Sequence, residues 1–162
     1  MRIKNLLLDN LLLVDIYNRA KKLHIEADVP RVVLILETQQ EKDHNPIENV
    51  KSLFGGKSKD FITAVDEKSI IIVKELAENE GYPEMDKLAE TILATLGLNK
   101  QPGTHIAYGT IVKELKEVSR SYKEARMALD VGKIFFGERE VIAYSSLGIG
   151  RLIYQLPIPL CK

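Results

Sequence analysis

The chain has 162 residues, enough for one domain with an appended segment, and a domain of this size buries roughly two thirds of the surface that its unfolded chain exposes. Its 23 Lys and Arg residues equal its 23 Asp and Glu residues, and no basic block concentrates the positive charge, so the sequence argues against nucleic-acid binding by this chain alone. The single cysteine, Cys161, excludes an internal disulfide and is typical of a protein in the reducing cytoplasm.

The first 28 residues predict a helix that is apolar on more than one side. Residues 6–14 are nearly all apolar, as in a signal peptide, but Asp9, Asn10 and Asp15 interrupt or end the run. No stretch approaches the roughly 20 apolar residues that span a bilayer, so we expect neither a targeting segment nor membrane association. We expect residues 1–28 to be a connecting helix that pairs two copies of the chain or contacts an upstream domain. The alternative is a helix enclosed within its own domain.

From residue 29 onwards the sequence predicts alternating strands and helices. In chain order, the expected elements are a buried strand at 31–37, a short helix at 46–53, a hairpin at 60–65 and 69–74, a helix at 83–96, a strand at 104–110, a long helix at 115–136, a strand at 141–144 and a short helix at 148–156. The clearest helix begins at Pro83 and stops at Gly97. The continuous apolar run at 70–73 predicts a central strand covered on both faces.

This order of elements predicts an α+β sandwich in which helices cover a mostly antiparallel sheet. It reads strand, helix, hairpin, helix, strand, helix, strand, which is βαββαβ with one further element. That is the ferredoxin-like arrangement shared by many nucleotide cyclases and polymerase palms. We expect this domain to span residues 29–156. Pro157 and Pro159 end regular structure, so residues 157–162 are expected to begin a linker.

One glycine-rich segment resembles a phosphate-binding loop only in part. Gly56-Lys57-Ser58 mimics the end of a P-loop, yet Lys51 stands where the first glycine is required. The segment also follows a helix instead of joining a strand to a helix. A helix stop and a turn are therefore expected there.

The histidines and serines lack the context that metal binding or nucleophilic catalysis requires. The histidines lie far apart on different elements and have no cysteine partner, so no zinc site is expected at His24, His44 or His105. The serine pairs lack a G-x-S-x-G pattern, so no nucleophile is expected at Ser119, Ser121, Ser145 or Ser146.

Four residues near the end of the fourth expected strand allow two interpretations. Tyr108 and Gly109 lie on that strand, and Arg120 and Arg126 lie on the following helix. A glycine in a strand can mark the close approach of a ligand, and helix arginines beside it could clamp an anion. The interpretation that we favour is that Gly109 makes room for helix packing and that the arginines lie on a solvated face.

Three segments in the second half of the chain carry a resemblance to a known family. They are residues 104–110 (THIAYGT), 117–132 (EVSRSYKEARMALDVG) and 141–148 (VIAYSSLG), and the most specific part is SYKEAR at 121–126. These segments are similar to the central domain of the sugar-diacid-regulator (CdaR) and purine-catabolism-regulator (PucR) families. Residues 19–25 and Pro30 resemble the entry into the same domain, so the likeness extends from about residue 6 to residue 157.

The resemblance implies a degenerate GGDEF-like domain, a distant relative of diguanylate cyclases, between an N-terminal sensor and a C-terminal helix-turn-helix. The expected function is that of a noncatalytic regulatory and oligomerisation domain of a bacterial transcription regulator. Homodimers or larger homo-oligomers are expected to form through the N-terminal helix. Residues 157–162 resemble the junction to the DNA-binding segment, so DNA is expected to be bound only through a helix-turn-helix beyond this chain.

The residues that a cyclase would need are largely missing, so we expect no catalytic activity, no cofactor and no metal. A diguanylate cyclase uses hairpin glycines to admit the nucleotide and several carboxylates to hold two divalent ions. Here the hairpin tip at 64–69 reads AVDEKS, so Asp66 and Glu67 are interpreted as a solvated turn, and the first strand ends with one carboxylate, Glu37. The alternative is an atypical nucleotide-binding or cyclase-like enzyme that uses these three acids with magnesium.

Overall fold

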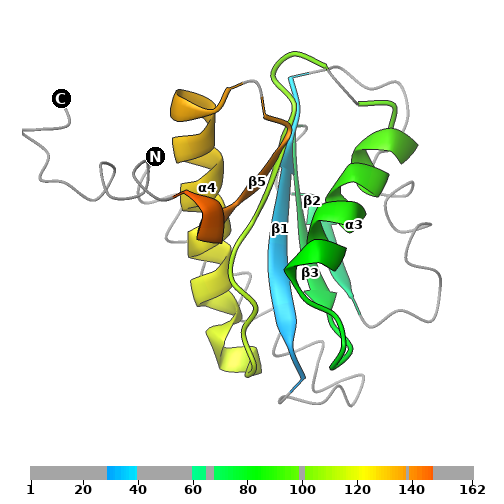
Figure 1. Ribbon diagram of the computed structural model, residues 1–162, viewed down its shortest axis with the longest axis vertical. Helices are drawn as coiled ribbons and strands as arrows, with labels where there is room; N and C mark the ends of the chain where they lie inside the picture. Colours follow the sequence, from blue (N-terminus) through cyan, green and yellow to red (C-terminus); the bar gives the residue numbers. More distant parts are fainter. Residues whose placement is uncertain (1–28, 40–59, 65–67, 99–100, 138, 148–162) are drawn as a thin grey trace, which may run out of the picture.

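The computed structural model describes residues 29–39, 60–64, 68–98, 101–137 and 139–147 (Figure 1). Several expected features lie outside these residues: the helices at 1–28, 46–53 and 148–156, the linker at 157–162, and Gly56-Lys57-Ser58, His24, His44, Asp66 and Glu67. Within the described ranges, no helix is long and apolar enough to cross a membrane.

The described strands form one five-stranded sheet with β1 in the middle. The strands are β1 (Arg31–Glu37), β2 (Phe61–Ala64), β3 (Ser69–Glu75), β4 (His105–Tyr108) and β5 (Val141–Ala143). Their order across the sheet is β2-β3-β1-β4-β5; β4 and β5 are parallel, and the other neighbours are antiparallel. Every residue of β1 is buried, as the apolar run at 31–37 predicts.

Two described helices cover opposite faces of this sheet (Figure 1). Helix α3 (Tyr82–Thr95) has a proline in its first turn, and the N–H of Gly81 donates to the Glu84 carboxylate at 2.9 Å. Helix α4 (Val118–Phe135) follows a 3-10 turn, η1 (Leu115–Glu117), and a second such turn, η2 (Tyr144–Ser146), follows β5. The long helix expected from residue 115 therefore starts as a 3-10 turn.

Alternate residues of the strands build two separate apolar layers, because successive strand side chains point to opposite faces. Val33 and Ile35 of β1 belong to the α4-side layer, together with Tyr122 of α4. Leu34 and Leu36 belong to the α3-side layer. Residues 70–73 divide between the two layers in the same way, so β3 is covered on both faces, as predicted.

The described elements agree with the mixed α+β domain expected from the sequence. The order of β1 to β4 matches the ferredoxin-like arrangement, β5 extends the sheet, and the expected helix between β1 and β2 falls outside the described residues. One strand is shorter than expected, because the segment predicted at 104–110 ends at Tyr108. Beyond it, the Thr110 backbone forms hydrogen bonds with side chains of α4 instead of a neighbouring strand.

Candidate functional site

A cluster of charged side chains lies where the C-terminal end of β1 meets the last turns of α4. The Glu37 residue is only 8% exposed. The Lys133 ammonium lies 2.8 Å from its Oε1, and the Arg126 guanidinium lies 4.0 Å from its Oε2. Arg126 also pairs with Asp130, one turn further along the helix, at 3.8 Å. We call these four residues the β1-end cluster: Glu37, Arg126, Asp130 and Lys133.

The β1-end cluster balances two negative charges against two positive ones. Burial raises the pKa of the Asp130 carboxyl, and the charge of Glu37 adds to this effect, whereas Arg126 and Lys133 act in the opposite direction. The guanidinium Nε of Arg126 is buried without a hydrogen-bond partner among the described residues. The cluster is therefore internally neutral, which leaves little net charge to attract an ion of either sign.

His105 lies next to Glu37 on the same face of the sheet, because the two residues are paired across β1 and β4. Its Nε2 lies 3.1 Å from the carbonyl oxygen of Gly137, just past the end of α4. Its Nδ1 is buried and has no partner among the described residues. In the described part of the chain, no three His, Cys, Asp or Glu residues gather in a way that could hold a metal ion.

The four residues considered as an anion clamp do not come together. The Tyr108 ring belongs to the α3-side layer, and its hydroxyl donates to the Asp86 carboxylate at 2.6 Å. Arg120 is exposed on α4 and pairs with Glu117 at 3.6 Å, while Arg126 is held in the β1-end cluster. Because Tyr108 and the arginines lie on opposite sides of the sheet, they cannot line one pocket.

Gly109 makes room for α4, as the favoured interpretation proposes. A Cβ atom built on Gly109 would lie 2.2 Å from the backbone oxygen of Ser121 and 2.8 Å from its hydroxyl oxygen. The Ser121 hydroxyl accepts a hydrogen bond from the Val33 N–H at 3.0 Å and donates one to the Thr110 carbonyl at 2.8 Å. Ser121 therefore joins the helix to the sheet, and its hydroxyl both donates and accepts a hydrogen bond within the protein.

The most specific segment of the resemblance, residues 121–126, coincides with these contacts between α4 and the sheet. Ser121 bonds to β1, Glu124 accepts hydrogen bonds from both the N–H and the hydroxyl of Thr110, and Arg126 reaches Glu37. Tyr122 and Ala125 are buried in the α4-side layer. Each of these five residues thus has a packing role.

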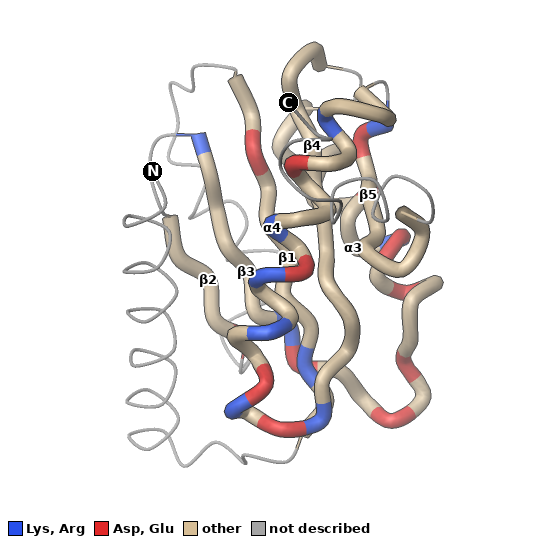
Figure 2. The backbone as a smooth tube through the Cα atoms, turned by 90° about the vertical axis from the view of Figure 1, so that its left-hand side faces the viewer, with Lys and Arg blue, Asp and Glu red and all other residues tan. Residues whose placement is uncertain are grey.

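Charged residues of both signs are mixed along the described backbone (Figure 2). Figure 2 shows Lys and Arg positions interspersed with Asp and Glu positions over the loops and helices. Along the described backbone the two signs are therefore mixed, which agrees with the equal charge totals of the sequence.

The sequence model of the GGDEF-like domain matches residues 10–131. The chain belongs to the GGDEF-like domain family. A solved structure of a microbial GGDEF domain, described with a novel interaction mode with bis-(3,5)-cyclic di-GMP, is similar to this GGDEF-like domain with a TM-score of 0.48 and 16% sequence identity. The similarity covers 83% of this chain and 89% of that chain. No curated protein matches the chain.

Membership of the family confirms the GGDEF-like part of the resemblance. The narrower resemblance to the CdaR and PucR regulators stays a prediction. Two residues of the β1-end cluster were missed in the sequence, Asp130 and Lys133. Asp130 pairs with Arg126 one turn away, and Lys133 contacts Glu37 on a distant segment. A basic residue two turns after Arg126 on the same helix was the one available signal for Lys133.

Proposed function

We propose that this GGDEF-like domain is a noncatalytic regulatory domain of a bacterial transcription regulator, of the kind found in the CdaR and PucR families. In this role it would couple an N-terminal sensor to a C-terminal helix-turn-helix in the cytoplasm. The single observation that supports the proposal most is the ion pairing of Glu37, the one carboxylate at the end of β1.

Glu37 already has cationic partners within the protein. A cyclase that works with two divalent ions needs several carboxylates whose charge is available to the metals. Here the Lys133 ammonium is bonded to Glu37 at 2.8 Å, and Arg126 adds a second positive charge. Binding a divalent ion at Glu37 would require breaking a part-buried ion pair and leaving Lys133 without its acceptor. This arrangement favours a structural role for Glu37.

Calorimetry on the full chain with magnesium and guanine or adenine nucleotides tests the proposal. We expect no binding heat and no cyclic dinucleotide product. Lys133→Met frees Glu37 while retaining a long apolar stem, and Lys123→Met, an exposed position on the same helix, is the matched control. Nucleotide turnover by the wild-type chain would overturn the noncatalytic proposal and support the alternative of a cyclase-like enzyme that uses Glu37, Asp66 and Glu67.

The regulatory part of the proposal requires an element that both flanking modules can bias. The Leu-rich segment at 1–28 is the candidate, because its wide apolar surface fits a helix pair between two copies. Light scattering over a concentration series should reveal a dimer or larger assembly, and Leu8→Glu with Leu12→Glu should weaken it. A monomer at every concentration would contradict this part of the proposal.

A further inference from the structure

Two large apolar side chains at the end of α4 remain exposed. Ile134 is 68% exposed and Phe135 is 45% exposed, and no other large hydrophobic residue in the described ranges is as open. They follow Lys133, whose bond to Glu37 places this end of the helix beside the end of β1. We call these two residues the α4-end patch: Ile134 and Phe135.

The α4-end patch is too small to hold two free molecules together by itself. A stable interface buries about 800 Å² on each partner. A fully buried aromatic side chain contributes about 150–250 Å², so Phe135 and Ile134 together stay well below that size. A segment tethered to the same domain needs far less contact area, because its effective concentration at the patch is high.

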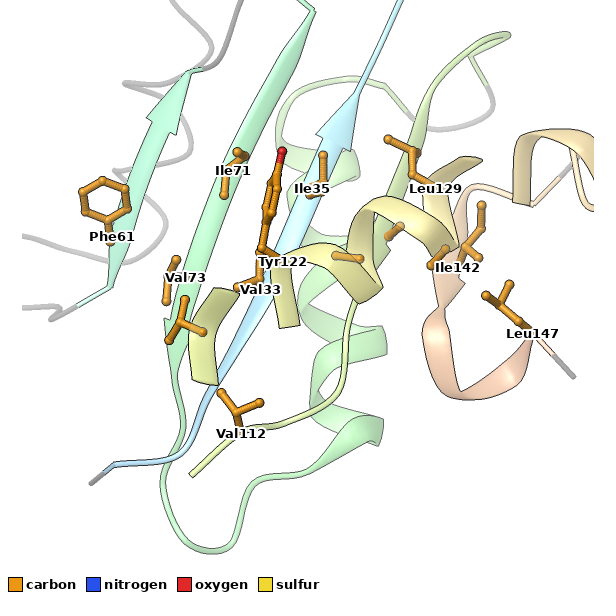
Figure 3. Packing of buried hydrophobic residues seen from close by; sticks show 14 of the residues in the cluster. Val33, Ile35, Phe61, Ile71, Val73, Val112, Tyr122, Leu129, Ile142 and Leu147 are labelled. Atoms are coloured by element: carbon orange, nitrogen blue, oxygen red, sulfur yellow. The ribbon is translucent and has the colours of Figure 1, made fainter. Parts of the chain in front are cut away.

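The C-terminal segment at 148–162 is the tethered segment that starts from the same side of the sheet. The last described residue before it, Leu147, is buried in the α4-side layer with Ile142 (Figure 3). If extended, residues 148–162 reach about 50 Å, much more than the length of α4 between its middle and its end. The segment is rich in apolar residues that could cover the patch: Ile149, Leu152, Ile153, Tyr154, Leu156, Ile158 and Leu160.

The N-terminal segment is a poorer fit for the α4-end patch. It enters β1 at Arg31, whereas the patch lies beside Glu37 at the other end of the strand. Seven strand residues separate these ends by about 20 Å. The C-terminal segment starts nearer the patch, because Ala143 at the end of β5 lies level with Tyr108 and Leu34, in the middle of β1. The shorter tether gives this segment the higher effective concentration at the patch, which favours it as the occupant.

We propose that residues 152–156 of the C-terminal segment dock on the α4-end patch. Burial of the leucine and isoleucine side chains against Ile134 and Phe135 would remove apolar surface from water. The docking does not depend on the regulatory role proposed above. If that role is also correct, the docked segment links α4 directly to whatever follows in the chain.

Hydrogen exchange on the full chain tests the docking. The backbone amides of residues 152–156 should be protected in the wild type, and Ile134→Asp should speed their exchange about tenfold, because a charge replaces the apolar contact. Phe135→Ser provides a second, smaller disruption. Thr91→Asp, which adds the same charge at an exposed position on α3, is the matched control and should leave the exchange unchanged.

Three outcomes would overturn the proposal. The first is free exchange at 152–156 in the wild type, and the second is protection that survives both patch variants while circular dichroism shows them folded. The third is protection that increases with protein concentration, since this would identify a second copy as the occupant. None of these outcomes bears on nucleotide turnover, so the docking can fail while the noncatalytic proposal stands.

Discussion

The two faces of the sheet hold their helices by different means. On the α4 face, polar groups bond directly to the sheet or to the segment that follows β4: Ser121 to Val33, Glu124 to Thr110 and Lys133 to Glu37. On the α3 face the contacts are mostly apolar, and two polar ones lie at the start of α3: the Tyr108 hydroxyl donates to Asp86, and the Ile111 N–H donates to the Tyr82 hydroxyl.

This difference matters because apolar packing has no preferred direction, whereas a hydrogen bond has one. Three polar contacts spaced along α4 specify where the helix lies along β1, and a shift of one residue would leave buried groups unpaired. Among the described contacts, helix α3 makes such polar contacts only in its first two turns, at Tyr82 and Asp86. We expect α4 to be the more rigidly placed helix.

The largest loss of stability should come from Gly109→Ala, on the α4 face. The new Cβ would overlap the backbone oxygen of Ser121 at 2.2 Å, and backbone cannot move aside as a side chain can. We expect a loss of about 3 kcal/mol in the free energy of unfolding, measured by urea denaturation.

The control for that variant is Gly132→Ala, also on the α4 face. There the new Cβ meets Ile142, first at the tip of its flexible side chain, and alanine favours the helix by about 1 kcal/mol. A loss as large in Gly132→Ala as in Gly109→Ala would show that side-chain crowding, and not the close backbone approach, limits the α4 face.

A smaller effect is expected from Ser121→Ala, which removes one polar link and leaves the apolar packing in place. The buried Val33 N–H and the part-buried Thr110 carbonyl would lose their partner. We expect a loss of about 2 kcal/mol, measured in the same denaturation assay. Thr91→Ala, which removes an exposed hydroxyl bonded within α3, should change stability by less than about 0.5 kcal/mol. Equal stability losses in Ser121→Ala and Thr91→Ala would contradict the stabilising role assigned to the polar contacts of the α4 face.

Of the three variants that change contacts to the sheet, Tyr108→Phe on the α3 face should have the smallest effect, about 1 kcal/mol near neutral pH, since only one hydrogen bond to an exposed residue is lost. Burial and the bond to Asp86 raise the pKa of Tyr108 above its ordinary value of 10.0. Above that pH the unfolded chain releases the phenol proton while the folded chain keeps it, so stability falls as pH rises. The wild type should show this alkaline loss and Tyr108→Phe should show less of it; identical profiles would contradict the assignment.

Local patterns predicted most of the described fold. The strand at 31–37 and the hairpin were visible as apolar runs, and α3 was visible from Pro83, its helical spacing and Gly97. These features depend on neighbouring residues only. The end of β4 at Tyr108 was not predictable, because it depends on two α4 side chains, Ser121 and Glu124, that bond to the Thr110 backbone.

The candidate site shows the same division between local and distant information. Glu37 could be singled out as the lone acid at the end of an expected strand. Its neutralisation by Lys133 depends on two residues 96 positions apart, and no periodicity links them. The clamp considered for Tyr108 and Arg126 failed because strand alternation directs Tyr108 to the face opposite α4.

The parallel pairing of β4 and β5 has a consequence for synthesis on the ribosome. Because β5 returns only after the whole of α4, β4 has no neighbour on its outer side until residues 141–143 have left the exit tunnel. During that interval β4 is an open sheet edge that another nascent chain could pair with. Pairing of the three-residue strand β5 with β4 then covers this edge.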